Sequence, residues 1–275
     1  TNVQVMVYHA LFGPKGQSPE GITGLITDIS SQKQFVDQTW KALEAERDLS
    51  DIKTNFISTV SHEFRTPLTT IMASAGLIRL NLIKWNNDRV LHHVTKILNS
   101  VNFMTKMLDD ILLINRGERG KIGLNPTDTD LHQFCYGVIE EFLLQVHATH
   151  KIEFSYTGIE GLFKIDTTLL RYILNNLISN AIKYTISNGN IMFIVNAGND
   201  SLGFQISDNG IGIEESDKAK LFEPFFRGSN TESIKGNGLG LSIVKRCVEI
   251  HGGSININST INKGTTVNFT IKSEL

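Results

Sequence analysis

The sequence predicts an α+β protein: a long two-helix hairpin, forming a dimeric four-helix bundle, followed by an α/β sandwich with a mixed, largely antiparallel sheet. Between residues 31 and 84 Pro67 is the only proline, and apolar residues recur at steps of three and four, which is typical of a long amphipathic helix. The same spacing returns over residues 90–115, after the polar break Trp85–Asp88. Beyond residue 129 apolar strands follow one another without a helix between them, so antiparallel pairs are expected.

Length and composition limit the classes of function. The 275 residues suffice for about two domains. The formal net charge of −2 gives no basic excess, so we expect no nucleic-acid partner. No run approaches about 18 apolar residues, so we expect no membrane contact by this portion and a cytoplasmic location, with any membrane anchor of a longer protein lying upstream. Cys135 and Cys247 lie in amphipathic helical segments and are interpreted as small core residues rather than a disulfide.

Residues 1–30 alternate apolar and polar positions on either side of a Gly-Pro-Lys-Gly turn at 13–16, which predicts a β-hairpin. The stretch Gly24–Ser30 resembles the closing strand of a PAS sensor domain, with Ser30 in place of a threonine. Residues 1–30 would then be the C-terminal remnant of a PAS-like domain. Ala42, Ala45 and Leu49 continue at coiled-coil spacing, so residues 31–50 are interpreted as a signalling linker.

The hairpin is expected over residues 51–116. In its first helix apolar residues at three- and four-residue steps form one buried face: Phe56, Val60, Phe64, Leu68 and Ile71. His62, Glu63 and Thr66 project from another face, and Pro67 should bend the helix just beyond them. The second helix should end near Asn115. The apolar stripe of the hairpin must pack against other apolar surface. We favour a second copy of the chain, which would complete a four-helix bundle; the alternative is the chain's own downstream domain.

The string Ser61-His-Glu-Phe-Arg-Thr-Pro-Leu68 resembles the phosphoacceptor box of sensor histidine kinases. The resemblance implies that His62 accepts a phosphoryl group from ATP, with Glu63 as general base. It also implies a reverse phosphatase activity, in which Thr66 orients a water molecule.

A linker is expected at residues 117–128, where glycines alternate with charges, and a catalytic ATP-binding domain at 129–275. Within this domain we expect helices at 129–147, 166–185 and 239–251. Strands are expected at 151–156, 190–197, 201–208, 253–259 and 264–272.

The segment Asn176–Tyr184 resembles the asparagine box of the histidine-kinase, gyrase and chaperone type of ATP-binding domain. The resemblance makes Asn180 the Mg²⁺ ligand, with Asn176 beside it. An amide oxygen suits this metal, which keeps several waters and bridges to phosphate oxygens. Lys183 would neutralise phosphate, and Tyr184 would flank the base or the ribose.

Three further motifs follow in the order of that family. Asp208-Asn-Gly210-Ile-Gly212 resembles the first glycine box, in which the aspartate accepts a hydrogen bond from the adenine amino group. Phe222–Arg227 resembles the phenylalanine box, and Gly236-Asn-Gly238-Leu239-Gly240 the second glycine box, which opens onto a helix and meets the triphosphate. The hydroxyl of Thr265 would support the contact between aspartate and adenine. Residues 214–235, poor in apolar side chains, are predicted to form a lid that orders around nucleotide.

The sequence therefore predicts a homodimeric sensor histidine kinase that uses ATP and Mg²⁺ to phosphorylate His62. It would pass the phosphoryl group to an aspartate of a response regulator. One alternative is an ATPase of the gyrase or chaperone type, but those enzymes place a glutamate where this chain has Asn176. The other is a non-catalytic scaffold or phosphatase-only protein that keeps the fold.

Overall fold

A computed structural model describes residues 5–12, 21–81, 85–118, 123–146, 149–231, 234 and 236–273. The chain divides into two compact units, residues 1–60 and 61–275, and the long helix α1 (Ser30–Asn81) belongs partly to each. In the first unit β1 (Val5–Phe12) and β2 (Gly21–Asp28) pair antiparallel, with Val5 opposite Asp28. The predicted β-hairpin is confirmed; its turn at 13–16 lies outside the described residues, and the PAS-like assignment stays a prediction.

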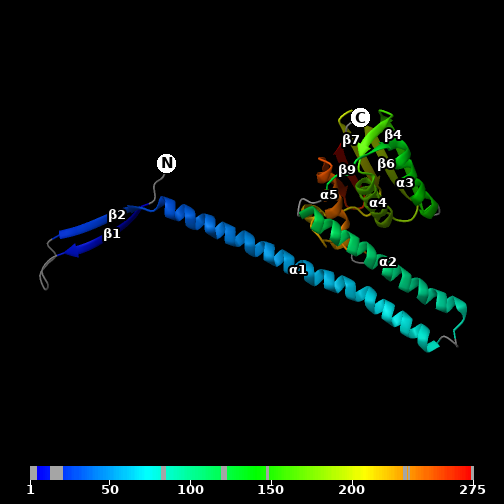
Figure 1. Ribbon diagram of the computed structural model, residues 1–275, viewed down its shortest axis with the longest axis horizontal. Coiled ribbons are helices and arrows are strands. Elements are labelled where there is room, and N and C mark those ends of the chain that lie inside the picture. The colour runs from blue at the N-terminus through cyan, green and yellow to red at the C-terminus, as the bar shows by residue number, and fades with distance from the viewer. Residues whose placement is uncertain are drawn as a thin grey trace. The chain divides into compact units, whose positions relative to one another are not determined.

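The second unit begins with a helical hairpin. The C-terminal part of α1 is followed by α2 (Asn87–Glu118), which turns back along it (Figure 1). The helix α1 continues unbroken through Pro67. The second helix extends to Glu118, beyond its predicted end near Asn115.

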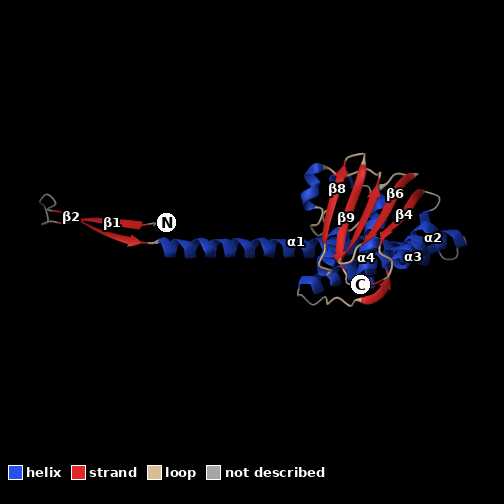
Figure 2. Cartoon of the chain, turned by 90° about the horizontal axis from the view of Figure 1, so that it is seen from above, coloured by secondary structure: helices blue, strands red, loops and turns tan. Residues whose placement is uncertain are grey.

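The rest of the second unit is an α/β sandwich. Its five-stranded sheet has the order β4-β6-β7-β9-β8, in which β4 and β6 are parallel and the other pairs are antiparallel. These strands span His150–Gly158 (β4), Gly189–Ala197 (β6), Ser201–Asp208 (β7), Ser254–Thr260 (β8) and Gly264–Lys272 (β9). The helices are α3 (Leu131–Val146), α4 (Thr167–Tyr184) and α5 (Gly240–Ile250). The mixed, largely antiparallel sheet is thus confirmed (Figure 2).

Two short strands were not predicted. The strand β3 (Thr127–Asp130) pairs antiparallel with β5 (Leu162–Ile165), so two residues of the expected linker belong to a sheet. Asp166 then caps α4: one carboxylate oxygen accepts from the amides of Thr168 and Leu169, at 3.1 Å each. The other oxygen accepts from the amide of Asn125 at 3.0 Å, which ties the end of the linker to the start of α4.

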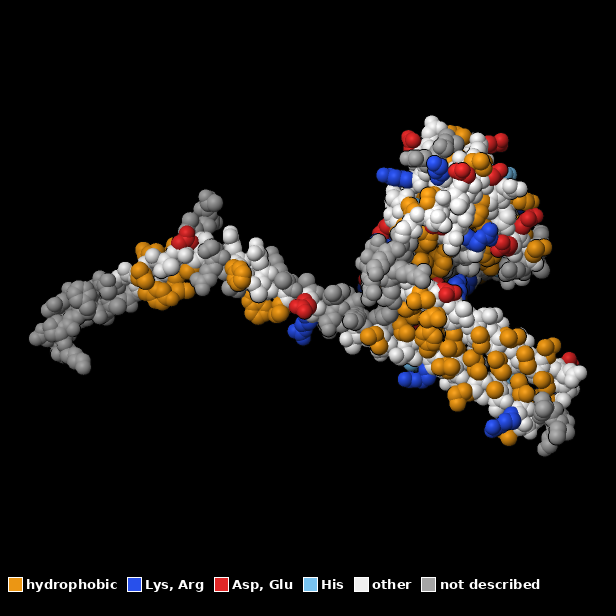
Figure 3. Space-filling model, in the orientation of Figure 1, with side chains coloured by type: hydrophobic (Ala, Val, Ile, Leu, Met, Phe, Trp, Pro, Cys, Tyr) orange, Lys and Arg blue, Asp and Glu red, His pale blue; other side chains and the backbone are white. Residues whose placement is uncertain are grey.

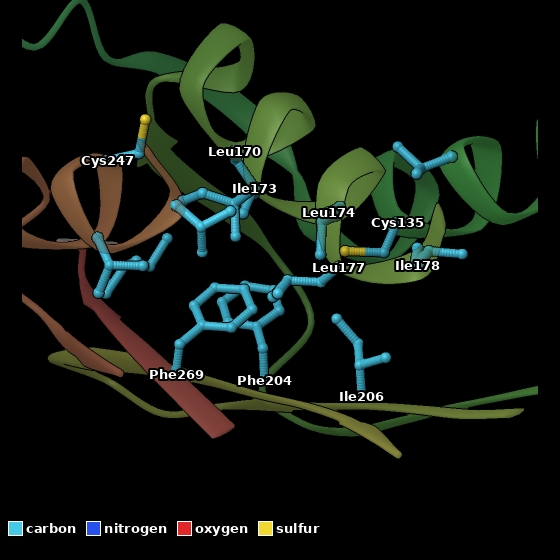
Figure 4. Packing of buried hydrophobic residues seen from close by; sticks show 14 of the residues in the cluster. Cys135, Leu170, Ile173, Leu174, Leu177, Ile178, Phe204, Ile206, Cys247 and Phe269 are labelled. Carbon is cyan, nitrogen blue, oxygen red and sulfur yellow. The ribbon is translucent and has the colours of Figure 1, made fainter. Parts of the chain in front are cut away.

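The core lies between the sheet and the helices. Side chains of β7 and β9 point toward those of α3, α4 and α5, and the rings of Phe204 and Phe269 stack at 4.5 Å (Figure 4). Cys135 and Cys247 are free, fully buried thiols in this core, as interpreted from the sequence, and burial raises the pKa of Cys247 to about 12. Met107 of α2 belongs to the same core, so the hairpin helix packs directly on the sandwich.

Candidate active site

The phosphoacceptor segment occupies an accessible turn of α1. The side chain of His62 is 73% exposed, and its Nδ1 lies 3.9 Å from Oε1 of Glu63, within ion-pair range but beyond hydrogen-bond length. Thr66, one turn later, is also exposed, and Phe64 packs partly against the core. Leu68, expected on the buried face, is 46% exposed in the single chain. The polar set thus faces outward as predicted, whereas part of the apolar face remains uncovered.

A cavity of about 310 Å³ opens between α4, the glycine loops and α2. It brings together eleven of the residues that the sequence assigned to nucleotide: Asn176, Asn180, Lys183, Tyr184, Asp208, Gly212, Arg227, Gly236, Gly238, Gly240 and Thr265. Gly210, Phe222 and Leu239 do not line it. The amide of Gly210 donates to Asp208, the ring of Phe222 lies 5.3 Å from Nζ of Lys245, and Leu239 is fully buried.

The helix α4 supplies one wall of this cavity. Asn176, Asn180 and Lys183 recur at steps of four and three residues, so they share the face that borders the cavity. Nδ2 of Asn176 donates to the carbonyl of Tyr172 at 2.9 Å, which orients its side chain. Nζ of Lys183 donates to the hydroxyl of Tyr184 at 3.0 Å and stands 4.6 Å from the centre of that ring.

Asp208 stands at the end of β7, where the adenine acceptor was predicted. Its Oδ1 accepts from the amides of Gly210, at 2.9 Å, and Thr265, at 3.2 Å. Burial raises the pKa of this carboxyl, and the two amide hydrogen bonds offset part of that shift. The hydroxyl of Thr265 instead lies 2.9 Å from Oγ of Ser259, so the backbone amide of Thr265, not its hydroxyl, supports the aspartate.

Glycine is required at two turns that border the cavity. Gly212 has φ +68°, and a Cβ there would lie 2.1 Å from the carbonyl oxygen of Thr260. Gly238 also has φ +68° and would press a Cβ against the backbone of Phe225, whose amide donates to the Gly238 carbonyl at 3.0 Å. The two glycine loops can therefore follow these paths only without side chains.

The predicted lid contains two short 3₁₀ turns, Glu215–Lys220 and Ser229–Thr231. Arg227 borders the cavity, but its guanidinium also donates to the carbonyls of Thr231, at 2.8 Å, and Ile234, at 2.6 Å. Arg227 therefore holds the backbone of the lid through its guanidinium group. Residues 232, 233 and 235 of the lid lie outside the described residues.

Sequence reasoning missed the contribution of α2 to the cavity. Phe103 and Lys106 line it, and Asp110, one turn further, is 1% exposed. Their spacing of three and four residues was visible in the sequence, but the apolar stripe there was assigned to the helical bundle. The signal that could have found them is the pair of charges Lys106 and Asp110 beside that stripe.

The donor set around the cavity suits one kind of metal site. Within the part of the chain that the structure describes, no group of three or more His, Cys, Asp or Glu side chains could hold an ion. The amides of Asn176 and Asn180 do border the cavity. Such a set fits Mg²⁺ bound mainly through phosphate oxygens and water, with an amide as protein ligand, and does not fit a metal held by protein alone.

Two family models match the chain. The His Kinase A (phospho-acceptor) domain matches residues 52–120, and the Histidine kinase-, DNA gyrase B-, and HSP90-like ATPase matches residues 165–275. The virulence sensor protein BvgS of Bordetella bronchiseptica is 32% identical over 263 residues, covering 92% of this chain. The chain belongs to the sensor histidine kinases. It spans 21% of the length of BvgS, so it corresponds to one part of that sensor histidine kinase.

Solved structures share the fold. Full-length ShkA, crystallised in complex with AMPPNP, is 25% identical with a TM-score of 0.60, covering 79% of this chain and 46% of ShkA. The histidine kinase ThkA, in complex with the response regulator protein TrrA, is 23% identical with a TM-score of 0.59, covering 97% of this chain and 74% of ThkA. None of the described helices in this histidine kinase chain is long and apolar enough to cross a membrane.

Proposed function

We propose that the chain is the ATP-dependent autophosphorylating core of a sensor histidine kinase and that it acts as a homodimer. The observation that supports this most strongly is the presence, in one chain, of an accessible histidine beside a carboxylate and a cavity bordered by a glycine-loop aspartate. Neither would suffice alone, because exposed histidines and nucleotide cavities both occur in proteins without kinase activity.

In the nucleotide site, the aspartate carboxylate accepts and cannot donate, so Asp208 selects a base with an amino group at the matching position. The backbone amides of Gly210 and Thr265 hold that carboxylate in place. Lys183 and the N-terminus of α5, where Gly238 and Gly240 border the cavity, would meet the phosphates. Asn180, with Asn176 beside it, would hold a nucleotide-bound Mg²⁺, which supplies neutralisation of phosphate charge.

The transfer step uses the neutral imidazole of His62. Glu63 lies on the Nδ1 side of the ring, so Nε2 is the nitrogen that faces away from the carboxylate. A side-chain rotation that brings the carboxylate to hydrogen-bond length fixes the proton on Nδ1 and leaves the Nε2 lone pair as nucleophile. The Nε2–P bond forms, the bond between the γ-phosphorus and the β–γ bridging oxygen breaks, ADP leaves, and Glu63 accepts the Nδ1 proton.

The phosphoryl group would then pass to an aspartate of a response regulator receiver domain, the class of protein that ThkA binds in its solved complex. Thr66 is exposed one turn from His62. From there its hydroxyl can orient a water molecule for the reverse, phosphatase reaction.

Incubation with γ-labelled ATP and Mg²⁺ tests the proposal. We expect label on the protein that survives base and is lost in acid, which is the behaviour of phosphohistidine. Release of labelled inorganic phosphate without label on the chain would instead support an ATPase, and the absence of both would support a scaffold.

A further inference from the structure

One face of α2 lies against the nucleotide cavity. Phe103, Lys106, Met107 and Asp110 recur at helical spacing, so they form a single stripe. Phe103 and Lys106 border the cavity, while Met107 and Asp110 are almost fully buried. The hairpin therefore contributes side chains to a site that the sequence assigned wholly to the ATP-binding domain.

Asp110 is a buried carboxylate that bonds to two elements of the ATP-binding domain. Its Oδ1 accepts from the hydroxyl of Tyr172 on α4 at 2.5 Å, and its Oδ2 accepts from Nδ2 of Asn237 at 3.1 Å. Burial, together with the nearby Asp110 charge, raises the pKa of Tyr172, so this hydroxyl remains a donor. A carboxylate is tolerated in such a place only when hydrogen bonds replace its water.

Asn237 transmits this contact to the second glycine loop. Its Oδ1 accepts from the amide of Leu239 at 3.1 Å, which fixes the orientation of the amide group with Nδ2 toward Asp110. Gly236, Gly238 and Gly240, on both sides of these residues, border the cavity. The path of the loop that would receive the triphosphate is therefore tied to α2.

Lys106 adds a positive charge to the same wall. Two other cations border the cavity, but Arg227 donates to lid carbonyls and Lys183 to the Tyr184 hydroxyl. Among the described residues no carboxylate lies within ion-pair distance of Lys106. Its ammonium group is thus available for an anionic ligand.

We propose that α2 completes the nucleoside triphosphate site: Asp110 is a positioning residue that holds the second glycine loop through Asn237, and Lys106 is a phosphate-binding residue. The inference rests on the proposed function, since it assumes that the cavity takes a nucleotide. Nucleotide affinity and docking of the hairpin helix are then linked, and each strengthens the other.

Calorimetric titration of the full chain with AMPPNP and Mg²⁺, and separately with adenosine, tests the proposal. Asp110→Ala should weaken AMPPNP binding about fivefold or more, because hydrogen bonds to charged groups are among the stronger ones. Its neighbour Asp109 is exposed, and Asp109→Ala is the matched control, expected to bind as the wild type does. Lys106→Gln should weaken AMPPNP binding but not adenosine binding, whereas Lys96→Gln on the same helix should change neither.

Asn237→Ala, at a partly exposed position, covers the case in which Asp110→Ala fails to fold. The double variant that carries both Asp110→Ala and Asn237→Ala should bind AMPPNP no more weakly than Asn237→Ala alone. Either change by itself already breaks the hydrogen bond between Asp110 and Asn237. In the labelling reaction Asp110→Ala should raise KM for ATP, whereas a general loss of folded protein would lower kcat alone.

Unchanged AMPPNP affinity in Asp110→Ala or Asn237→Ala, or additive effects of the two changes, would overturn the positioning role of Asp110. Equal losses for AMPPNP and adenosine in Lys106→Gln would overturn the phosphate role.

Hydrogen exchange separates this inference from the proposed function. In nucleotide-free protein the amides of residues 236–240 should exchange faster in Asp110→Ala than in Asp109→Ala. Equal rates reject the connection between α2 and the loop even if the wild type binds nucleotide. If the wild type binds no AMPPNP, the proposed function fails and the phosphate role of Lys106 fails with it, while the exchange rates still decide whether Asp110 holds the loop.

Discussion

At the scale of single residues, the proposed mechanism places the phosphoryl acceptor His62 apart from the nucleotide cavity. Its ring is exposed on α1, and His62 does not line the cavity, which is bordered by residues of α2, α4, β7, β9 and the glycine loops. We expect His62→Gln to abolish label incorporation from γ-labelled ATP and to leave ATP affinity within about twofold of the wild type, because the affected residue is a surface side chain. Label persisting in this variant would show that another residue is the acceptor.

Asp208 should show a conflict between stability and binding. The pKa of its carboxyl is raised, so the stability that this group provides at low pH is lost as pH rises through the raised value. At neutral pH the buried carboxylate is ionised at a cost in stability, and Asp208→Asn removes that charge. The asparagine keeps an oxygen that can accept from the amides of Gly210 and Thr265. We expect the free energy of unfolding in urea to be unchanged or higher.

The same variant should bind ATP about tenfold or more weakly, because a donor replaces an acceptor opposite the adenine amino group and an unpaired polar group costs about 1–3 kcal/mol. Calorimetry measures this loss, with Asp200→Asn as a control at an acidic residue away from the cavity. Unchanged affinity would mean that the base is recognised elsewhere.

Sequence motifs predict residue identities better than residue partners. The asparagine and glycine motifs placed nine residues at one cavity, because each motif is a short contiguous segment whose side chains lie near one another. The contact of Thr265 was harder to predict. Its amide meets Asp208 because β7 and β9 pair Asp208 opposite Thr265, and its hydroxyl meets Ser259 because β8 and β9 pair those two residues. Strand register between distant segments is not readable from local spacing.

At the scale of elements, the lid between the glycine loops should respond to nucleotide. Polar contacts hold the part of the lid around Ser229–Thr231: the Ser229 amide donates to Asp217 at 2.8 Å, and Nδ2 of Asn230 donates to the Gly212 carbonyl at 3.0 Å. Such contacts compete with water, so local opening costs little free energy. We expect the amides of residues 229–238 to exchange more slowly when AMPPNP and Mg²⁺ are added.

Arg227→Ala provides a control for this expectation, because it removes the two hydrogen bonds that the guanidinium makes to lid carbonyls. The variant should exchange faster than the wild type without nucleotide and regain only part of the protection with it. Mass spectrometry of the lid peptides reports both states. Equal exchange with and without AMPPNP in the wild type would identify an ordinary surface loop.

The elements that could be predicted are those with a long periodic pattern. The helices α1 to α5 and the five strands of the central sheet carry apolar residues at regular steps, and most of these elements are at least eight residues long. The sequence predicted all of them. The strands β3 and β5 have four residues each, and β3 is the polar sequence Thr-Asp-Thr-Asp, so neither has a period to detect. They exist because they pair with each other at a sequence distance that no local pattern reveals.

At the scale of the whole molecule, the hairpin carries hydrophobic side chains that the single chain does not cover. Met72, Leu80, Leu91 and Leu98 are 73%, 74%, 63% and 57% exposed, and Figure 3 shows hydrophobic side chains gathered along the hairpin. Met107 and Asp110 do pack on the ATP-binding domain, so that domain covers one part of α2 and leaves the rest of the stripe open. Contiguous apolar surface of this kind marks an interface.

We therefore expect the wild type to elute with a light-scattering mass of twice its 30.6 kDa, and Leu91→Glu with Leu98→Glu to elute at 30.6 kDa. Each buried leucine contributes about 1.5–3 kcal/mol, and a two-fold interface loses both residues on both subunits, so the dimer should dissociate at micromolar concentration.

Leu144→Glu is the matched control. Leu144 is 85% exposed on α3 of the ATP-binding domain, so this variant should leave the mass unchanged. The monomeric variant should still bind AMPPNP with wild-type affinity, because residues 91 and 98 do not border the cavity. A monomeric wild type, or a dimer that survives both glutamates, would contradict pairing through this face of the hairpin.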